Sequence, residues 1–497
     1  MADVILGVDI GTLSSKGLLV RLDGTVAATV VQQHEMSTPR PGWAEHDAER
    51  IWWGELVALT RQLLAQCPDD RVVAVGVSGI GPCLLPSDAT GRPLRPAILY
   101  GVDTRASAQI EALHARYGED AIRERCGSVL TSQAVGPKIQ WLRDEEPEVW
   151  ARTKSIHMSS SFLTNRLTGA YVLDHSSASQ CNPIYDPRAK AWIEDWAEDV
   201  APGLRLPELA WPGDVVGSVV PEAAEATGLP AGVPVVAGGI DAWTESVSVG
   251  VKRPGDVMLM YGTTMFLIEI VEELRTWPTL WGTVGALPDT YNLAAGMATS
   301  GAVTDWLRRV TSTSFEDLVE EARAVGPGAE GLVMLPYFAG ERTPLFDADA
   351  RGLVAGLTLR HHREHLYRAA LEATAFGVRH NLETMAEAGG HAARLVAVGG
   401  GTRGGLWTQI VSDVTQQPQQ LPHNTVGAAY GDALLAATGS GVVTEAETDK
   451  WNPVETTVEP DPAAAEAYDR LYALYRDLYP ATRDISHALA AIQRGGT

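Results

Sequence analysis

The chain has 497 residues, of which 45% are hydrophobic, and its 39 basic and 62 acidic side chains give a formal net charge of −23. This length predicts two or three compact domains, and this composition is typical of a globular α/β protein. Because so acidic a surface repels phosphate backbones and anionic lipids, the charge argues against nucleic acid and membranes as partners.

The cysteines and the first residues bear on the compartment. Cys67, Cys83, Cys126 and Cys181 are scattered, without the close spacing of a metal or redox motif. The chain begins without the basic segment of a signal peptide, and no run of about eighteen apolar residues occurs in it. We therefore expect a soluble, cytoplasmic protein with reduced thiols.

The first predicted element is a β-hairpin. Residues 4–8 and 17–20 are apolar runs typical of strands, and the sequence Asp9-Ile-Gly-Thr12 lies at the turn between them. At such a turn a carboxylate can hold hydrated Mg²⁺, a glycine lets the backbone approach a phosphate, and a threonine hydroxyl can donate to it. An ordinary hairpin turn is the alternative, because Asp and Gly are common in turns.

The remainder of the first half is predicted to be mixed α/β. Asp47 is a good N-cap for a helix whose apolar positions recur at helical spacing. The other predicted elements are strands at residues 26–31, 72–77, 96–100 and 233–237, a mainly helical stretch over residues 105–170, and a loop rich in proline and glycine over residues 202–234.

An aspartate follows the predicted strand at residues 233–237. Gly238 and Gly239 permit close approach of a ligand, and Asp241 lies just past the carboxyl end of the strand, where a general base is well placed. The same residue could instead cap the following helix. The local pattern leaves both interpretations open.

The plan of the opening hairpin returns about halfway along the chain. Residues 256–260 and 265–270 are strand-like, and Gly262, Thr263 and Thr264 lie in the turn between them. Such a repeat predicts two similar domains, residues 1–246 and 247–497, whose phosphate-binding turns could face each other across a cleft. The later predicted elements are strands at residues 332–335 and 395–398, helices at residues 361–388 and 406–414, and a C-terminal helix with an apolar stripe.

A glycine-rich turn follows the predicted strand at residues 395–398. Gly399, Gly401 and Gly404 have the GxGxxG spacing of a dinucleotide fingerprint, which would suggest a nicotinamide dehydrogenase. Residues 416–424 lack the acidic residue expected about twenty positions later, so we reject that interpretation. A flat glycine surface against a nucleotide fits better, and a tight strand-to-helix turn is the alternative.

Seven motifs, taken in order, resemble the landmarks of the FGGY carbohydrate kinases. They are DIGT (9–12), GWAEHD (42–47), KIQW (138–141), GID (239–241), GTT (262–264), RGLVAGLTL (351–359) and GGGT (399–402). Each motif alone is weak, but seven in the same order are specific. The resemblance covers almost the whole chain, from residue 4 to about residue 439.

The resemblance implies an α/β, actin-like ATPase fold of two similar, ribonuclease-H-like domains around a deep cleft, with ATP mostly on the C-terminal domain. By position, Asp241 matches the base that takes a proton from the attacking sugar hydroxyl, and Asp9 matches the residue that orients Mg²⁺. The matching nucleotide positions are Thr12, Gly262, Thr263 and Thr264 around the β- and γ-phosphates, and Gly301, Gly400, Gly401 and Thr402 on the adenosine side.

The resemblance also implies the reaction, which is transfer of the γ-phosphate of ATP to a small sugar. D-xylulose is expected first, giving D-xylulose 5-phosphate, although Gly81 and Pro82 stand where xylulose-phosphorylating members commonly carry Met-His. Asp103 is a candidate partner of sugar hydroxyls, with a surface salt bridge to Arg105 as the alternative. Ribulose, glycerol, gluconate and a nucleotide-switched, actin-like binding protein remain open. Many members are dimers, so a homodimer also remains open.

Overall fold

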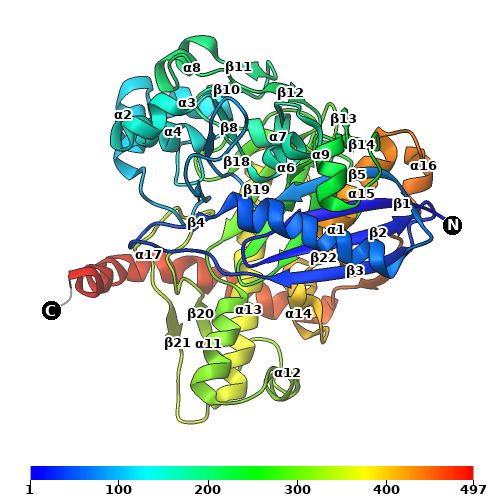
Figure 1. Ribbon diagram of the computed structural model, residues 1–497. Helices are drawn as coiled ribbons and strands as arrows, with labels where there is room; N and C mark the ends of the chain where they lie inside the picture. The colour runs from blue at the N-terminus through cyan, green and yellow to red at the C-terminus, as the bar shows by residue number, and fades with distance from the viewer. Residues whose placement is uncertain (1, 496–497) are drawn as a thin grey trace. The chain divides into compact units, whose positions relative to one another are not determined.

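The computed structural model describes residues 2–495, which form two compact units (Figure 1). The first unit consists of Met1–Lys252, Glu272–Asn292 and Val426–Pro453, and the second of Arg253–Val271, Leu293–Thr425 and Val454–Thr497. The chain therefore returns to the first unit twice after leaving it. The sequence predicts two domains that follow one another along the chain, with one boundary between residues 246 and 247. This division stays a prediction.

A mixed sheet forms the centre of the first unit, with the strand order β13-β14-β5-β1-β2-β3 (Figure 1). These strands are β1 (Asp3–Ile10), β2 (Ser14–Arg21), β3 (Val26–Gln33), β5 (Arg71–Gly79), β13 (Val215–Ser218) and β14 (Pro234–Val236). β1 runs antiparallel to β2 and parallel to β5, and β5 runs parallel to β14. The predicted opening hairpin is thereby confirmed.

Two helices far apart in the sequence pack on this sheet. α15 (Ala428–Gly439) lies close against β1 and β5, because Gly7 and Gly76 face it and a Cβ at either position would overlap a backbone oxygen of the helix. α1 (Gly54–Gln66) buries its leucines in the hydrophobic core that contains Leu6 of β1. Since successive strand residues point to opposite faces, the two helices cover opposite sides of β1.

The second unit repeats the plan of the first. Its strands follow the order β19-β17-β16-β22-β23-β24. They are β16 (Asp256–Tyr261), β17 (Met265–Val271), β19 (Tyr291–Met297), β22 (Arg394–Val398), β23 (Gln419–Pro422) and β24 (Val454–Val458). β16 runs antiparallel to β17 and parallel to β22, as β1 does to β2 and β5. The repeat that the sequence predicted is confirmed in the strand order.

The remaining elements complete the two units, and one of them, β15, pairs with the end of β5. In the first unit they are a π-helical turn (Ala48–Trp53), α2 (Ser107–Tyr117), α3 (Glu119–Cys126), α4 (Val135–Glu145), α5 (Pro147–Arg152), α6 (Ser159–Thr168), α7 (His175–Ala178), α8 (Glu194–Val200), α9 (Pro221–Thr227), α10 (Asp241–Ser248), α16 (Glu445–Thr448), β4 (Glu45–His46), β6 (Leu85–Ser87), β7 (Ala97–Ile98), β8 (Ser155–His157), β9 (Val172–Asp174), β10 (Tyr185–Asp186), β11 (Ala191–Trp192), β12 (Glu208–Ala210), β15 (Gly239–Ile240) and β18 (Trp281–Val284). In the second unit they are α11 (Gly301–Thr311), α12 (Phe315–Ala324), α13 (Arg363–Glu387), α14 (Leu406–Thr415), α17 (Ala465–Gly495), β20 (Val333–Leu335), β21 (Leu353–Ala355) and two 3₁₀ turns (Gly400–Thr402 and Pro462–Ala464).

The prediction of a loop over residues 202–234 is wrong. The segment contains β12, β13 and α9. Pro221 is the first residue of α9, and Gly228, with φ of 84°, ends it in the left-handed conformation. Proline and glycine therefore mark the two ends of a short helix here. The same residue types are also typical of loops, which is why the sequence predicted one.

The C-terminal stripe packs as core. Tyr468, Tyr472 and Tyr475 of α17 are buried, and Tyr475 shares a hydrogen bond of 2.8 Å with the Tyr337 hydroxyl. Within residues 2–495, none of the helices is both long and apolar enough to cross a membrane.

Candidate active site

Four carboxyl groups gather in the first unit at the carboxyl ends of parallel strands. Strand register aligns Asp9 of β1 with Ser78 of β5, and Ser78 with Gly239 of β15, two residues before Asp241. Because three neighbouring parallel strands end at the same edge, their last residues and the first turn of α10 come together there. The remaining two groups are Glu245, one turn further along α10, and Asp432, on α15.

Burial and mutual repulsion raise the pKa values of these carboxyl groups above those of ordinary carboxyl groups. Burial raises the pKa of Asp9 and of Asp241, and the charge of Asp9 raises that of Asp241 further. Burial and the Asp9 charge likewise raise the pKa of Glu245 to about 7, and burial raises that of Asp432 well above its usual range. Such shifts are typical of sites that move protons or bind cations.

Asp241 begins α10 and keeps one oxygen available. It is the first helical residue, whereas Ile240 holds the N-cap position, so the alternative that Asp241 caps this helix is wrong. Its Oδ1 accepts from the Ala242 N–H at 2.7 Å. No hydrogen bond to Oδ2 is found among residues 2–495, and the side chain is only half-buried.

Lys16 and Ser78 were missed by the sequence analysis. Lys16 lies directly opposite Asp9 in the hairpin, donates to the Val426 carbonyl, and its charge lowers the pKa of Asp9. The Ser78 hydroxyl lies 2.6 Å from Asp432 and 3.2 Å from Asp9. The hairpin register alone could have indicated Lys16, because it places a cation beside the predicted metal-type carboxylate.

The predicted substrate residues Gly81 and Pro82 lie beside Asp241. A Cβ at Gly81 would lie 2.7 Å from the Ile240 side chain. Burial raises the pKa of the Cys83 thiol, and the nearby charge of Asp241 contributes to the same shift. The loop after β5 therefore borders the carboxyl groups. The Thr12 hydroxyl lies 3.3 Å from the Tyr100 hydroxyl.

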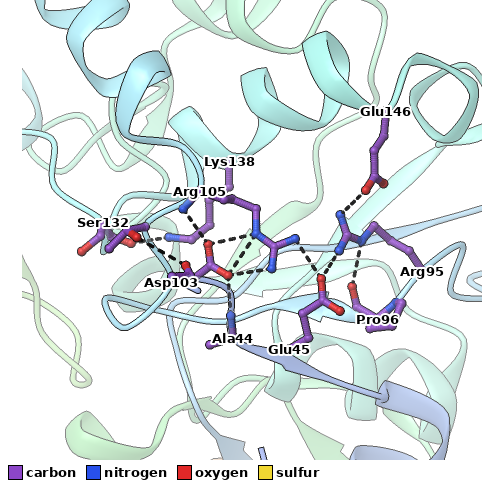
Figure 2. A network of polar contacts seen from close by, with 11 residues as sticks. Ala44, Glu45, Arg95, Pro96, Asp103, Arg105, Ser132, Lys138 and Glu146 are labelled. Carbon is purple, nitrogen blue, oxygen red and sulfur yellow. Dashed lines mark hydrogen bonds and ion pairs between the residues drawn. The ribbon is translucent and has the colours of Figure 1, made fainter. Parts of the chain in front are cut away.

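Asp103 is paired with Arg105, but the pair is buried, so the alternative of a surface salt bridge is wrong (Figure 2). Its oxygens accept from the Arg105 side chain at 2.7 and 3.0 Å and from the Ala44 N–H at 2.7 Å. Glu45 binds the same guanidinium at 2.8 Å. These contacts occupy Asp103 and anchor its loop, while a contact with a sugar hydroxyl stays a prediction.

Lys138, from the predicted KIQW motif, is buried beside this network (Figure 2). Its ammonium group donates to the backbone carbonyls of Ser132 and Ala134. Burial lowers its pKa to about 8. Lys138 therefore holds the start of α4 and the loop before it.

A cavity of about 600 Å³ opens in the second unit at the end of β16. It is lined by glycine turns, by apolar side chains and by four polar or charged residues, namely Tyr261, Gly262, Thr263, Gly301, Thr304, Asp305, Phe315, Val319, Tyr367, Leu371, Gly400, Gly401, Arg403, Leu406 and Trp407. Five of the eight predicted nucleotide residues line it. Its aromatic walls were missed, because their side chains come from β16, α12, α13 and α14, which lie far apart in the sequence.

The turn after β16 is fastened to α11. The Gly301 N–H donates to the Gly262 carbonyl at 3.0 Å, and the Ala302 N–H donates to the Thr263 carbonyl at 3.0 Å. Thr264 and Thr402 do not line the cavity. The Thr402 hydroxyl instead donates to the Gly399 carbonyl at 2.8 Å and so shapes the glycine turn.

Comparisons with known proteins agree with this arrangement. Two family models match, the N-terminal domain of the FGGY carbohydrate kinases over residues 4–247 and the C-terminal domain over residues 257–440. The solved xylulose kinase from Rhodospirillum rubrum is 34% identical with a TM-score of 0.90, and the match covers 97% of this chain and 100% of that one.

Two curated relatives extend the comparison. The xylulose kinase of Bacillus subtilis (strain 168) is 28% identical over 504 residues, covering 99% of both chains. The glycerol kinase of Nocardia farcinica (strain IFM 10152) is 30% identical over 466 residues, covering 89% of this chain and 92% of the relative. With both of its domain models matched in order, the chain belongs to the FGGY family of carbohydrate kinases.

Proposed function

We propose that this protein transfers the γ-phosphate of ATP to a hydroxyl of a small sugar, with D-xylulose as the first candidate and D-xylulose 5-phosphate as its product. The observation that carries the proposal is Asp241, half-buried beside Asp9 and Glu245, with a pKa raised by burial and by its acidic neighbours. The names of the relatives from Rhodospirillum rubrum and Bacillus subtilis support xylulose over other sugars.

Asp241 is proposed as the general base. The sugar hydroxyl loses its proton to the carboxylate as its oxygen bonds to the γ-phosphorus, while the bond from that phosphorus to the β–γ bridging oxygen breaks and ADP leaves. A carboxylate whose pKa is raised takes up a proton more readily than an ordinary aspartate. Because phosphoryl transfer depends mainly on positioning and charge neutralisation, one base and fixed phosphate donors suffice.

We also propose Mg²⁺ as the metal that accompanies ATP, with Asp9 as the residue that orients it. Among residues 2–495, no group of three or more His, Cys, Asp and Glu side chains could hold a metal ion alone. This fits Mg²⁺, which keeps several waters and uses one or two carboxylates together with nucleotide phosphates. When bound, the ion would neutralise charge on the phosphate oxygens.

The cavity of the second unit is proposed to take the adenosine part of ATP. Its apolar and aromatic walls suit a purine ring, and backbone beside Gly400 and Gly401 can lie flat against it. Thr12, Thr263 and Thr264 are proposed as donors to the β- and γ-phosphates, with Thr402 holding its turn in shape.

Gly81 and Pro82 favour a second candidate for the sugar that accepts the phosphate in this reaction. They border Asp241 yet differ from the Met-His pair expected for a xylulose kinase, so ribulose, glycerol or gluconate remains the alternative acceptor.

The protein is also proposed to lie in the cytoplasm and to form a homodimer. Exposed apolar side chains on α17 support an interface, namely Leu474, Ile485, Leu489 and Ile492.

The test is ADP release from Mg·ATP with a panel of ketoses, polyols and sugar acids. We expect one sugar, D-xylulose first, to raise turnover at least roughly a hundredfold above the rate without sugar. If only glycerol or gluconate stimulates ADP release, that compound and not D-xylulose is the acceptor. ATP binding without stimulation by any sugar would contradict the kinase activity and favour the nucleotide-switched alternative.

A further inference from the structure

One backbone carbonyl in the opening hairpin accepts hydrogen bonds from two histidines. The Thr12 oxygen lies 3.1 Å from His34 Nε2 and 3.1 Å from His46 Nε2. The two rings meet edge to face, with centroids 5.1 Å apart. His46 is fully buried, and the His34 side chain is 1% exposed. Two buried side chains thus bind a single backbone carbonyl.

The tautomer of His46 is determined by the hydrogen bond that its other ring nitrogen accepts. Trp52 Nε1, which can only donate, lies 3.2 Å from His46 Nδ1. The His46 ring must therefore carry its hydrogen on Nε2, the atom that faces Thr12. Burial lowers the pKa of His46 to about 4, so the ring stays neutral at pH 7 and keeps this tautomer.

His34 is fixed by an acid. Its Nδ1 lies 3.0 Å from Glu55 Oε2, and the same oxygen accepts from the Ser15 hydroxyl at 2.6 Å. The two ring nitrogens of His34 thus face two acceptors, the Glu55 carboxyl group and the Thr12 carbonyl, and these two contacts fix the orientation of the ring.

This clamp determines where the next amide points. In a trans peptide, the carbonyl of Thr12 and the N–H of Leu13 point in opposite directions. Since the carbonyl is held toward the histidines, the Leu13 N–H faces away from them, at a residue whose exposed fraction is 57%. No partner for this N–H is found among residues 2–495, although the Leu13 carbonyl accepts from the His34 N–H at 3.0 Å.

His46 also links the hairpin to the loop of Asp103. It belongs to the GWAEHD segment, in which the preceding residues, Ala44 and Glu45, bind Asp103 and Arg105 (Figure 2). One short segment therefore holds both the phosphate hairpin and the loop that carries a predicted sugar-binding residue.

We propose that His34 and His46 are positioning residues that aim the Leu13 N–H at the β- or γ-phosphate of ATP. The inference rests on the proposed function, because it takes the hairpin as the place where phosphate binds. It assigns a purpose to two histidines that touch neither phosphate nor sugar. A preset donor binds phosphate more tightly, because it need not be ordered when the nucleotide arrives.

The test compares ATP with AMP, which lacks the β- and γ-phosphates. Titration calorimetry and steady-state kinetics are run on wild type, His34→Leu, His46→Leu and the double variant. We expect each single variant to raise Kd and KM for ATP roughly tenfold while Kd for AMP stays unchanged. The double variant should lose more than the product of the two, because the Thr12 carbonyl then has neither histidine as a donor.

Conservative and matched variants separate positioning from folding. His46→Gln retains a donor at the end of the side chain and should restore most of the ATP affinity, and Trp52→Phe should weaken it by freeing the tautomer. Trp192→Phe removes an equivalent indole bond, to the Pro207 carbonyl at 3.0 Å, and His114→Leu removes a histidine bond to the Leu130 N–H at 3.2 Å. Both controls should leave ATP affinity unchanged.

The outcomes are distinct. Equal weakening of ATP and AMP, or a lower melting temperature with unchanged ATP affinity in the folded fraction, would overturn the positioning role. An absence of sugar-dependent ATP turnover in the wild type would instead contradict the proposed function. If the leucine variants fail to fold, His46→Gln and Trp52→Phe still decide the question.

Discussion

At the scale of single residues, Asp241 depends on its acidic neighbours. Burial is the main cause of its raised pKa, the Asp9 charge the next, and Glu245 adds a smaller contribution. Since a general base acts in its ionised form, kcat/KM for the sugar should rise as pH increases through this pKa. Below that pH the carboxyl group holds a proton and cannot accept another.

Replacing Glu245 with glutamine tests this electrostatic account. The substitution removes a like charge, so the pKa of Asp241 falls and the acid limb of the kcat/KM profile should move to lower pH by roughly half a unit to one unit. Glu222→Gln on α9, an exposed position, serves as the matched control. A limb that moves to higher pH would show that Glu245 helps Asp241 in some other way.

The sequence indicated some of these residues and could not indicate others. Asp9 begins the DIGT turn and Asp241 follows a pair of glycines, so local pattern sufficed. Asp432 could not be found, because its nearness to Ser78 arises from contact between residues 354 positions apart. Asp103 and Arg105 are neighbours in sequence, yet only the packing of the chain around them decides that their ion pair is buried.

At the scale of elements, the contact of α10 with α15 fixes the position of Asp241. Gly431 of α15 faces Thr244 of α10 so closely that a Cβ there would overlap the Thr244 carbonyl. Gly431→Ala should therefore lower the free energy of unfolding by about 1–3 kcal/mol. It should also lower kcat, because the displaced helix carries Asp241.

Urea denaturation and steady-state kinetics check this prediction. Gly326→Ala is the control, since nothing lies within 4 Å of a Cβ at that position. Loss of stability with unchanged kcat would mean that α10 moves without carrying Asp241 away. The hairpins, α1 and α13 were predictable from periodicity, whereas the place of α15 on β1 was not, because more than four hundred residues separate Gly7 from Ala429.

At the scale of the whole molecule, each unit supplies a different part of the chemistry. The first contains the carboxyl groups and the second contains the cavity proposed for adenosine. Strand order repeats between them, as the sequence predicted, but the return of residues 272–292 and 426–453 to the first unit has no local signal. Such returns depend on tertiary contacts alone.

A kinase must keep water from replacing the sugar. We expect ADP release without sugar to be at least roughly a hundredfold slower than with the preferred sugar, because water lacks the contacts that bring an attacking hydroxyl to the base. A coupled ADP assay at saturating ATP measures both rates. Comparable rates would identify an ATPase and contradict sugar as the acceptor.

The central claim is that Asp241 deprotonates the sugar during phosphoryl transfer. Phosphorus NMR of wild type and Asp241→Asn with Mg·ATP and the preferred sugar, together with ATP titration of both proteins, tests it most directly. We expect sugar phosphate from the wild type, a loss of at least roughly a thousandfold in its rate of formation in the variant, and equal ATP affinity. Sugar phosphate formed by the variant at a rate near that of the wild type would contradict the account.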